Sequence, residues 1–430
     1  MADSQPLHLL IVSGGRDLPD RARDASAGLR TTVICRPEVV PRLRSREKIQ
    51  RLIVLREDAP EDEWVAAARF VHAVDPVDRL TNFTEKDTEK TAAIGAALGL
   101  TWHSTETVRA VADKAEMRRR LASAGLGDVV AEVVHDVEGV LKVGERTGYP
   151  LICKPVRGVA SKGVTRIDGP ADIERALAWG ATGAGDLDSP ELMVEPFLTG
   201  EEYSVEAVSE DGEHLVVGVT RKISEPVHFV EVGHVVPAPL PTEDAERIGA
   251  AVRTALEALG VRQGVTHTEV IVAPETVHIV ETHLRPAGDE IPELWARTTG
   301  VDLIEVVARQ AVGRKVLDDV RAALGAPGDR PGAAAIWYAC PDAVGEIVEV
   351  TGTDEARALN GVVDVEVLRE PGKRLKGVTG SFARGAHVCA VGATQEEALL
   401  RAREGVRKIS FTVRSSGMAE RHEILAEHSG

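Results

Sequence analysis

Two glutamates occupy equivalent places in a pair of apolar runs near the middle of the chain. Residues 266–286 read THTEVIVAPETVHIVETHLRP, where both runs are rich in Val, Ile and Thr and flank the turn residues Pro274–Thr276. Such runs around a turn predict a β-hairpin with residues 274–276 as its loop. The predicted register places Ala273 opposite Val277, Ile271 opposite Ile279, Glu269 opposite Glu281, and His267 opposite His283, with the four polar residues, Ile271 and Ile279 on one face.

The opposed carboxylates need a positive partner. Directly opposed side chains in a sheet have Cβ atoms about 5 Å apart, and like charges at that distance are destabilising. Carboxylate oxygens suit magnesium, which is usually held by one or two carboxylates together with substrate phosphates. The hairpin alone leaves two interpretations open, a metal site and a solvated face. Arg285 directly follows the second run, where it could meet an anion beside a metal.

A lysine inside an apolar run is a second candidate. Lys154 lies in ICKPV, where a buried charge needs an anionic partner. Residues 157–163, RGVASKG, then combine basic side chains with small residues whose backbone N–H groups could approach phosphate oxygens. The alternative is a flexible surface hairpin with a snorkelling lysine. Glu195 and Glu202 flank a break at Leu198–Gly200, which could present backbone groups to adenine and a carboxylate to ribose.

The elements that must position these residues predict an α/β protein. Three short apolar runs in the first hundred residues, LHLLIV, TTVIC and RLIVL, are typical of buried parallel strands in a doubly wound sheet. The turn after the first run lacks the GxGxxG fingerprint of dinucleotide binding. Residues 85–98 and 106–124 predict helices, with Gly99 and Gly125 at their C-terminal ends.

Composition excludes several classes of function. A chain of 430 residues predicts roughly three domains. The net charge of −17 and an aromatic content of 3% argue against a nucleic-acid partner. The sequence shows neither a signal peptide nor an apolar stretch of about 20 residues, so no membrane association is expected. Four scattered cysteines predict reduced thiols, and the expected location is the cytoplasm.

Taken in order, these candidates resemble the active-site residues of the ATP-grasp superfamily. The resemblance covers nearly the whole chain and is closest to carboxylate–amine ligases of the L-amino acid ligase (dipeptide synthetase) type. The phrases that carry it are DKAEMRRRLASAGL, YPLICKP, MVEPFLTGEEYSVE, HFVEVGHVVPAPLP, GVTHTEV and ETHLRPAGDEIPEL.

The resemblance implies an ATP-grasp fold of the α/β and α+β classes. The expected domains are an N-terminal doubly wound α/β domain (1–113), a small lid domain (114–203), a large antiparallel-sheet domain with the metal site (204–325), and a C-terminal cap (333–430).

The resemblance also implies roles for individual residues. Lys114 and Lys154 would contact the phosphates and purine of ATP, and Arg285 would stabilise an acyl phosphate and a tetrahedral intermediate, so that Lys154 and Arg285 are the catalytic candidates. The remaining implied roles are the phosphate-covering loop for Ser161 and Gly163, adenine contact for Glu195, Phe197 and Leu198, ribose contact for Glu202, Mg²⁺ (with Mn²⁺ as an alternative) for Glu269 and Glu281, and the substrate site for Glu231, His234, Arg285 and Gly288.

The chain departs from the family pattern in two places. His283 stands where the family has an asparagine as third metal ligand, so it is either a metal ligand or a structural histidine, with the structural role favoured because magnesium prefers oxygen. Ala287–Glu290 replaces a glycine run. Its two acids could read a substrate ammonium group or cap the helix IPELWARTTG, and the capping role is favoured.

The resemblance implies an ATP-dependent ligase that joins an amino acid carboxylate to an amine, forming an amide or dipeptide bond through an acyl phosphate and releasing ADP and phosphate. Its partners would be small-molecule carboxylate and amine substrates, amino acids first among them, and a homodimer stays open. The alternatives are an ATP-grasp ligase or carboxylase with another acceptor, of the biotin-carboxylase or purine-pathway type, and a non-catalytic ATP-binding protein.

Overall fold

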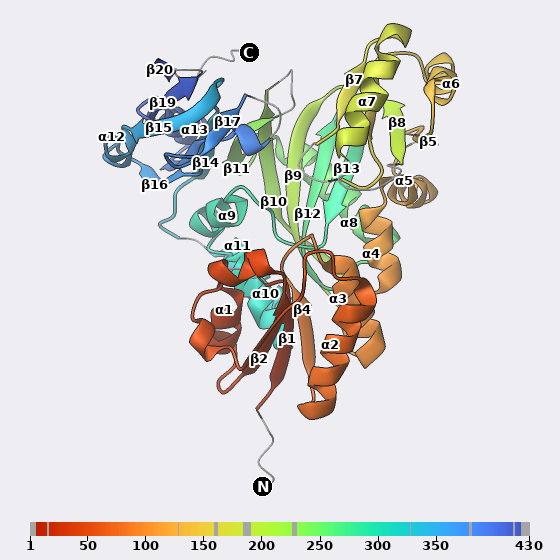
Figure 1. Ribbon diagram of the computed structural model, residues 1–430, viewed down its shortest axis with the longest axis vertical. Helices are drawn as coiled ribbons and strands as arrows, with labels where there is room; N and C mark the ends of the chain where they lie inside the picture. The colour runs from red at the N-terminus through yellow and green to blue at the C-terminus, as the bar shows by residue number, and fades with distance from the viewer. Residues whose placement is uncertain are drawn as a thin grey trace.

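Four β-sheets organise the part of the chain that the structure describes. A computed structural model describes residues 6–14, 17–127, 129–158, 162–183, 191–225, 230–326, 328–377, 381–415 and 418–422. The N-terminal part lies at one end of the molecule, and the C-terminal part and a smaller lobe (residues 132–196) lie at the other end, on either side of a central sheet (Figure 1).

The N-terminal sheet is parallel and doubly wound, as the apolar runs predict. Leu9 and Ile11 pack with α1, whereas Leu10 and Val12 pack with α2 and α3. Successive strand residues therefore serve opposite faces. The strand order is β3-β2-β1-β4, with β1 (His8–Val12), β2 (Arg30–Cys35), β3 (Arg51–Val54), β4 (Arg79–Asn82), α1 (Leu18–Ala25), α2 (Glu61–Val74) and α3 (Thr88–Leu98).

The helix predicted over residues 106–124 is wrong as a single helix, because the chain forms two. These are α4 (Thr105–Ala112) and α5 (Lys114–Ser123). Asp113 has extended backbone angles and its carboxylate accepts hydrogen bonds from the backbone N–H groups of Ala115 and Glu116. It is thus an N-cap, the position that aspartate prefers over a helix interior. The predicted helix end at Gly99 is confirmed, with φ at 66°.

A small antiparallel sheet forms the lobe that we call the lid. Its core comprises Val140, Val143, Leu151, Ile167 and Ile173, which are buried between the sheet and its two helices. The strand order is β5-β8-β6-β7, with β5 (Glu132–Val134), β6 (Leu151–Pro155), β7 (Thr165–Ile167), β8 (Leu192–Pro196), α6 (Val137–Thr147) and α7 (Ile173–Gly183).

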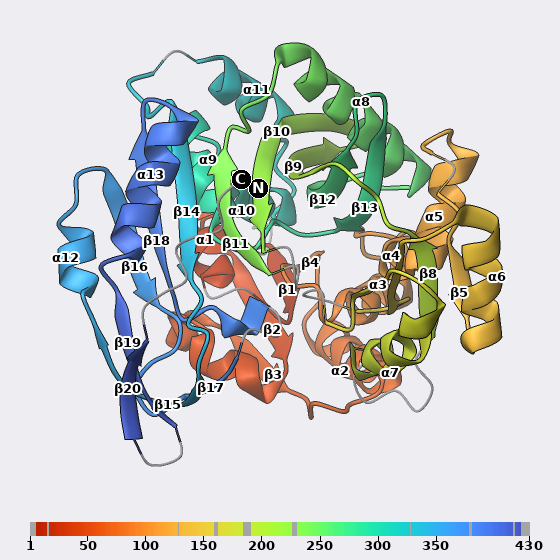
Figure 2. The same cartoon turned by 90° about the horizontal axis from the view of Figure 1, so that it is seen from above.

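The central sheet runs through both the predicted large domain and the predicted cap. Its order is β13-β12-β9-β10-β11-β14-β18-β16, in which β14 of the C-terminal part pairs directly with β11. Seen from above, the C-terminal strands continue the central sheet on the side away from the lid (Figure 2). The strands are β9 (Glu201–Glu210), β10 (Glu213–Ser224), β11 (Glu231–Val236), β12 (Gly264–Val272), β13 (Val277–His283), β14 (Ala333–Ala339), β16 (Val362–Val367) and β18 (Ala386–Gly392).

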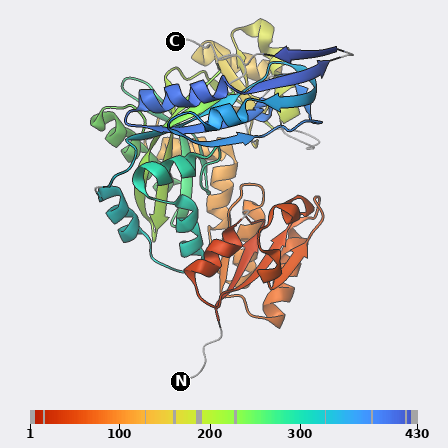
Figure 3. The same ribbon diagram turned by 90° about the vertical axis from the view of Figure 1, so that its left-hand side faces the viewer.

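Helices cover both faces of the central sheet. One face packs on α8 (Thr242–Ala258), and the other on α9 (Ile291–Thr299), α10 (Leu303–Ala311) and α11 (Leu317–Gly325). Of these, α10 also contacts α1 of the N-terminal part. A fourth sheet with two helices completes the C-terminal part (Figure 3). It contains β15 (Val344–Thr351), β17 (Arg374–Lys376), β19 (Ser410–Ser415) and β20 (Met418–His422), with α12 (Thr353–Arg357) and α13 (Gln395–Val406).

The predicted hairpin is confirmed, with the two functional pairs in place. Glu269 lies opposite Glu281 and His267 opposite His283. The inner part of the predicted register is wrong: the hairpin pairs Val272 with Val277, Ile271 with His278 and Val270 with Ile279.

The loop is therefore one residue longer than predicted, which shifts the register of the two strands by one residue. A β-bulge next to Glu269 restores the predicted register at the two glutamates. The bulge also turns Ile279 into the core beneath α8, away from the face that carries Glu281.

Cys35, Cys153, Cys340 and Cys389 are all buried free thiols, as the scattered cysteine pattern predicts. None of the helices in the described part of the chain has the length and hydropathy needed to span a bilayer.

The packing of α9 on the central sheet depends on a glycine. A Cβ atom at Gly218 of β10 would lie 2.0 Å from the indole ring of Trp295, whose Nε1 donates to Thr220. We expect Gly218→Ala to lower the free energy of unfolding by about 1–3 kcal/mol, because the indole must move out of its site. A melting curve measures this. Gly325→Ala, where a Cβ would meet no atom within 4 Å, is the control, and equal melting temperatures for both variants would contradict the expectation.

Candidate functional site

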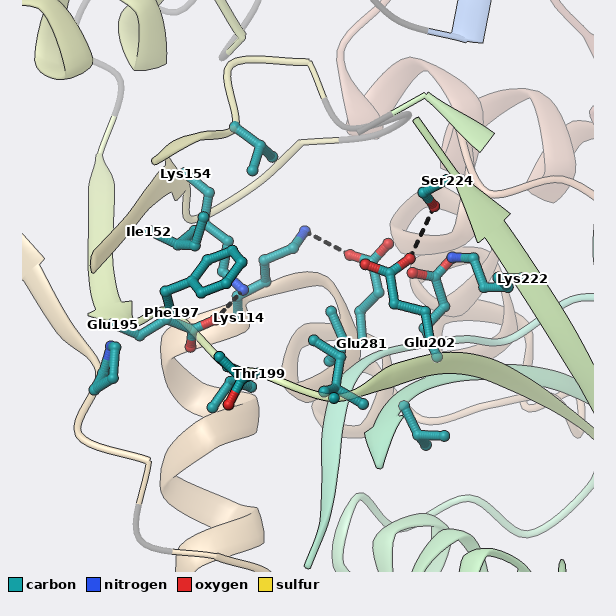
Figure 4. A pocket seen from close by; sticks show the side chains of 18 of the residues that line it. Lys114, Ile152, Lys154, Glu195, Phe197, Thr199, Glu202, Lys222, Ser224 and Glu281 are labelled. Carbon is teal, nitrogen blue, oxygen red and sulfur yellow. Dashed lines mark hydrogen bonds and ion pairs between the residues drawn. The ribbon is translucent and has the colours of Figure 1, made fainter. Parts of the chain in front are cut away.

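A cavity of about 350 Å³ lies between the lid and the central sheet. One end is mainly apolar and is formed by Ile152, Val164, Phe197 and Leu198. The other end is charged, with Lys114, Lys222, Glu269 and Glu281 on its wall. Figure 4 shows Phe197, Lys154 and Glu195 on one side of this space and Glu281, Glu202 and Lys222 on the other.

Lys154 was predicted to need an anionic partner, and the structure shows that this partner is Glu195. The Lys154 ammonium lies 2.5 Å from the carboxylate of Glu195, and Arg118 of α5 donates to the same carboxylate from 2.8 Å. Burial raises the pKa of the Glu195 carboxyl, but the two neighbouring cations outweigh burial and lower it to about 2. Glu195 therefore holds the lysine and the arginine in place through its charge.

The hairpin carboxylates are each paired with a lysine from a different element. Lys114, at the start of α5, lies 3.0 Å from Glu281, and Lys222 of β10 lies 2.9 Å from Glu269. Although burial opposes it, the Lys222 ammonium lowers the pKa of Glu269, and Lys114 does the same for Glu281. Both carboxylates are therefore ionised at neutral pH. The predicted repulsion between them exists only when both are charged, so this condition is met.

The N-terminal part contributes a third acid to this cluster. Glu85 accepts a hydrogen bond of 2.7 Å from the guanidinium of Arg285 and lies 3.1 Å from Nδ1 of His283. The other ring nitrogen of His283 lies 3.2 Å from Glu281. Burial lowers the pKa of His283, yet the adjacent Glu281 and Glu85 carboxylates raise it above its usual value.

A second cavity, of about 200 Å³, adjoins the first. It shares Lys222, Glu231, Glu269 and Glu281 with the larger cavity, so these four side chains form a common wall. On its far side it is lined by His234, Arg285, Gly288, Asp289, Ser381 and Arg384, among others.

Asp289 does not cap α9, so the favoured capping role is wrong. Its carboxylate lies 3.2 Å from Nε2 of His234 and accepts two hydrogen bonds, of 2.7 and 2.8 Å, from the guanidinium of Arg384. Glu290 is the N-cap residue of α9, but its side chain makes no capping hydrogen bond. Asp289 and Glu290 both have positive φ, at 58° and 57°, a conformation that costs energy in residues other than glycine and that concentrates at functional sites.

The structure brings nearly all the predicted site residues to the two cavities. The larger one is lined by Lys114, Lys154, Glu195, Phe197, Leu198, Glu202, Glu231, Glu269 and Glu281, and the smaller one by Glu231, His234, Glu269, Glu281, His283, Arg285 and Gly288. Gly163 lies just before β7 with φ at 80°, beside the lining residues Lys162 and Val164. Ser161 lies outside the described residues.

The residues present fit a divalent cation at the hairpin. Ligand atoms of Glu269, Glu281 and His283 lie within 4.8 Å of one another, and two of the three donors are carboxylates. Carboxylate oxygens are the protein ligands that Mg²⁺ prefers. The two ring nitrogens of His283 each face a carboxylate, that of Glu281 on one side and that of Glu85 on the other.

The sequence analysis missed Arg118, Lys222, Glu85 and Arg384. Only Lys222 carries a signal of the type that identified Lys154, since it lies within the strand sequence VVGVTRKIS and its side chain is buried. Arg118 is one of three consecutive arginines in α5, and nothing in the sequence distinguishes it from its exposed neighbour Arg119. Glu85 and Arg384 lie far along the chain from their partners.

Comparison with known families gives two matches. Residues 147–293 match the ATP-grasp domain, and residues 337–414 match the L-amino acid ligase C-terminal domain 2. Among solved structures, the L-amino acid ligase from Bacillus licheniformis superimposes with a TM-score of 0.80 at 21% identity, covering 96% of this chain and 100% of that one. At that identity the likeness establishes the fold.

Two relatives differ in what their names describe. The alanine–anticapsin ligase of Bacillus subtilis is 27% identical over 272 residues, 58% of this chain and 57% of that protein. The formate-dependent phosphoribosylglycinamide formyltransferase of Rhodococcus jostii is 30% identical over 304 residues, 68% of each chain. The chain thus spans little more than half the length of the alanine–anticapsin ligases that it matches.

The ion pairs of Glu195 lead to a pH-dependent prediction. Because the pKa of Glu195 is lowered from 4.5 to about 2, its stabilising effect is complete above pH 4.5 and is lost as the pH falls towards 2. We expect Glu195→Gln to cost about 3–5 kcal/mol at pH 7, since two buried cations lose their partner. The difference in melting temperature from the wild type should shrink only below about pH 4.5.

The control is Glu116→Gln. Glu116 also pairs with two arginines and has a pKa lowered to about 2, but it lies at the surface of α5. Exposed ion pairs contribute little to stability, so this variant should melt close to the wild type. A pH-independent difference for Glu195→Gln, or equal effects of the two substitutions, would contradict the role given to Glu195.

Proposed function

The chain belongs to the ATP-grasp superfamily, and from that premise we propose that it is an ATP-dependent ligase that joins an amino acid carboxylate to an amine. The observation that carries the proposal is the wall shared by the two cavities. Lys222, Glu231, Glu269 and Glu281 face the larger cavity on one side and the smaller one on the other. A nucleotide in the first cavity and a carboxylate in the second would therefore meet at this wall.

The larger cavity suits ATP as a substrate in its polarity. Its apolar end between Ile152, Phe197 and Leu198 matches a purine. Glu202, whose carboxylate accepts from Ser224, lies across the cavity from Phe197. Lys114 at the charged end, and Lys154 on the side of Phe197, would neutralise the phosphates. Positioning and charge neutralisation of this kind are the main contributions of a protein to phosphoryl transfer.

Glu269 and Glu281, with His283 beside them, would hold Mg²⁺, which when bound neutralises phosphate oxygens and withdraws charge from them. The chain's own part is to keep these two carboxylates ionised and in place. Lys222 and Lys114 achieve this by contacting one carboxylate each. Both lysines could then transfer their contacts to phosphate oxygens as a nucleotide arrives.

The proposed reaction has two steps. A carboxylate oxygen of the first substrate attacks the γ-phosphorus of ATP, the bond to the β,γ-bridging oxygen breaks, and an acyl phosphate and ADP result. The amine nitrogen then attacks the acyl carbon, phosphate leaves from the tetrahedral intermediate, and the nitrogen loses a proton. Arg285, at the wall of the smaller cavity, would bind the acyl phosphate and the developing oxyanion.

Two features support an amine ligase over a carboxylase. The C-terminal part matches a domain of L-amino acid ligases. The smaller cavity also offers carboxylates from Glu231 and Asp289, which suit a substrate ammonium group.

The proposal is tested by measuring phosphate release over all pairs of common amino acids, followed by mass spectrometry of the active mixtures. We expect ADP, phosphate and an amide product in stoichiometric amounts from at least one pair. Bicarbonate should not replace the carboxylate substrate. Phosphate release with bicarbonate alone, or none with any pair, would refute the proposal.

Glu281→Gln is expected to slow ADP release in the active mixture by at least about a hundredfold, because it removes one of the two charges that would hold the cation. Glu275→Gln is the matched control, since Glu275 is an exposed residue in the loop of the same hairpin. Wild-type rates are expected for the control. Undiminished turnover by Glu281→Gln would show that the hairpin carboxylates have no part in the reaction.

Arg285→Ala is expected to separate binding from chemistry. Arg285 faces the smaller cavity and is held by Glu85, so its loss should leave the affinity for ATP unchanged, as measured by calorimetry. Amide formation should slow by about a hundredfold or more, since an oxyanion would lose its charged donor. A parallel fall in ATP affinity would instead place Arg285 at the nucleotide.

A further inference from the structure

The smaller cavity has an unusual lining for a substrate site, and it supports an inference that rests on the proposed function. Among the described residues around it, only Ile291 has an apolar side chain. Small-molecule pockets are more often lined by apolar and aromatic groups with a few polar ones. A bulky apolar substrate side chain here would displace water from charged groups without offering them hydrogen bonds in its place, and such desolvation is costly.

Arg384 is the cation of this cavity that comes from the C-terminal part of the chain. Its guanidinium lies 4.2 Å from the ring centre of Tyr338, and its Nε donates to the backbone oxygen of Ser381 at 3.1 Å. Asp289 accepts from both of its terminal nitrogens. The side chain is 13% exposed, so the group is already desolvated and fixed in orientation before any substrate enters.

A continuous series of polar contacts runs from the hairpin to Arg384. Glu269 contacts Lys222 at 2.9 Å, and Lys222 contacts Glu231 at 2.6 Å. His234 lies 3.7 Å from Glu231 and 3.2 Å from Asp289, which binds Arg384. Arg384 is therefore at the end of the series remote from the carboxylates where chemistry would occur.

We propose that Arg384 is a specificity-determining residue that binds a carboxylate carried by the amine substrate, while Asp289 and Glu231 receive its ammonium group, which gives up one proton to solvent before the nitrogen attacks the acyl carbon. The substrate is then an amino acid with a small polar or charged side chain, oriented with its nitrogen towards Glu269 and its carboxylate towards Arg384. The ion pair of Arg384 and Asp289 offers one cation for the substrate carboxylate and one anion for the substrate ammonium. If each residue exchanges its partner for the matching substrate group, both keep an oppositely charged neighbour.

The competing explanation is a purely structural ion pair that fastens the C-terminal part to the loop before α9. The two explanations differ in what they predict for a substrate that lacks the carboxylate. A structural pair affects glycine and glycinamide equally, whereas a carboxylate-binding arginine affects only glycine.

The experiment compares kcat/KM for glycine and glycinamide, and for serine and leucine, as amine substrates with the carboxylate substrate held constant. Wild-type protein should prefer glycine to glycinamide and serine to leucine. Arg384→Ala should lower kcat/KM for glycine by about tenfold to a hundredfold through KM, which is the worth of a hydrogen bond to a charged group. The value for glycinamide should not change. For Arg384→Lys, kcat/KM for glycine should lie between those of the wild type and of Arg384→Ala, because lysine keeps the charge but lacks the planar pair of donors.

Arg403→Ala is the matched control. Arg403 stacks on Trp337 at 4.0 Å in the same part of the chain, but it does not line the cavity. Its loss should lower the melting temperature without changing the ratio of glycine to glycinamide. An equal loss for both amines in Arg384→Ala, or an unchanged ratio, would overturn the inference while the ligase reaction stands. Absence of amide formation by the wild type with every pair would overturn the proposed function and the inference together.

Discussion

The repulsion between Glu269 and Glu281 is the constraint on which the site depends. The hairpin places two half-buried carboxylates opposite each other, and such a pair is stable only with cations close by. Lys114 comes from α5 and Lys222 from β10, so the lid-proximal helix and the central sheet are both tied to the same hairpin. The lysine charges that would neutralise a nucleotide's phosphates thus also hold α5, β10 and the hairpin together.

Short-range patterns in the sequence predicted the elements well. Runs of β-branched residues located the hairpin, and turn residues located its loop. The register near the loop was wrong because one-residue differences in loop length leave no mark in the alternation of apolar residues. The pairing of Glu269 with Glu281 was nevertheless right. The longer loop shifts the register by one residue, and the bulge shifts it back before the two glutamates. The break at Asp113 was missed because the apolar pattern continues from α4 into α5.

Contacts between distant segments were beyond prediction from one sequence. Glu85 and Arg285 are 200 residues apart, and Arg384 lies 95 residues from Asp289. Glu85 and Arg384 are ordinary charged residues in their local sequence and become part of the site only when two parts of the chain meet. Where the burial of a charge could be inferred from its neighbours, as for Lys154, the need for a partner was correctly predicted and its identity was supplied by the fold.

The direct pairing of β14 with β11 has a mechanical consequence. Gly233 to Val236 and Ala334 to Trp337 share a ladder of backbone hydrogen bonds, so the C-terminal part cannot swing away from the substrate wall without breaking it. In the described part of the chain, the lid sheet shares no strand with the central sheet. The lid can therefore move relative to the central sheet without breaking a backbone ladder. The acceptor would meet a rigid template, and selectivity there would come from lock-and-key complementarity and not from induced fit.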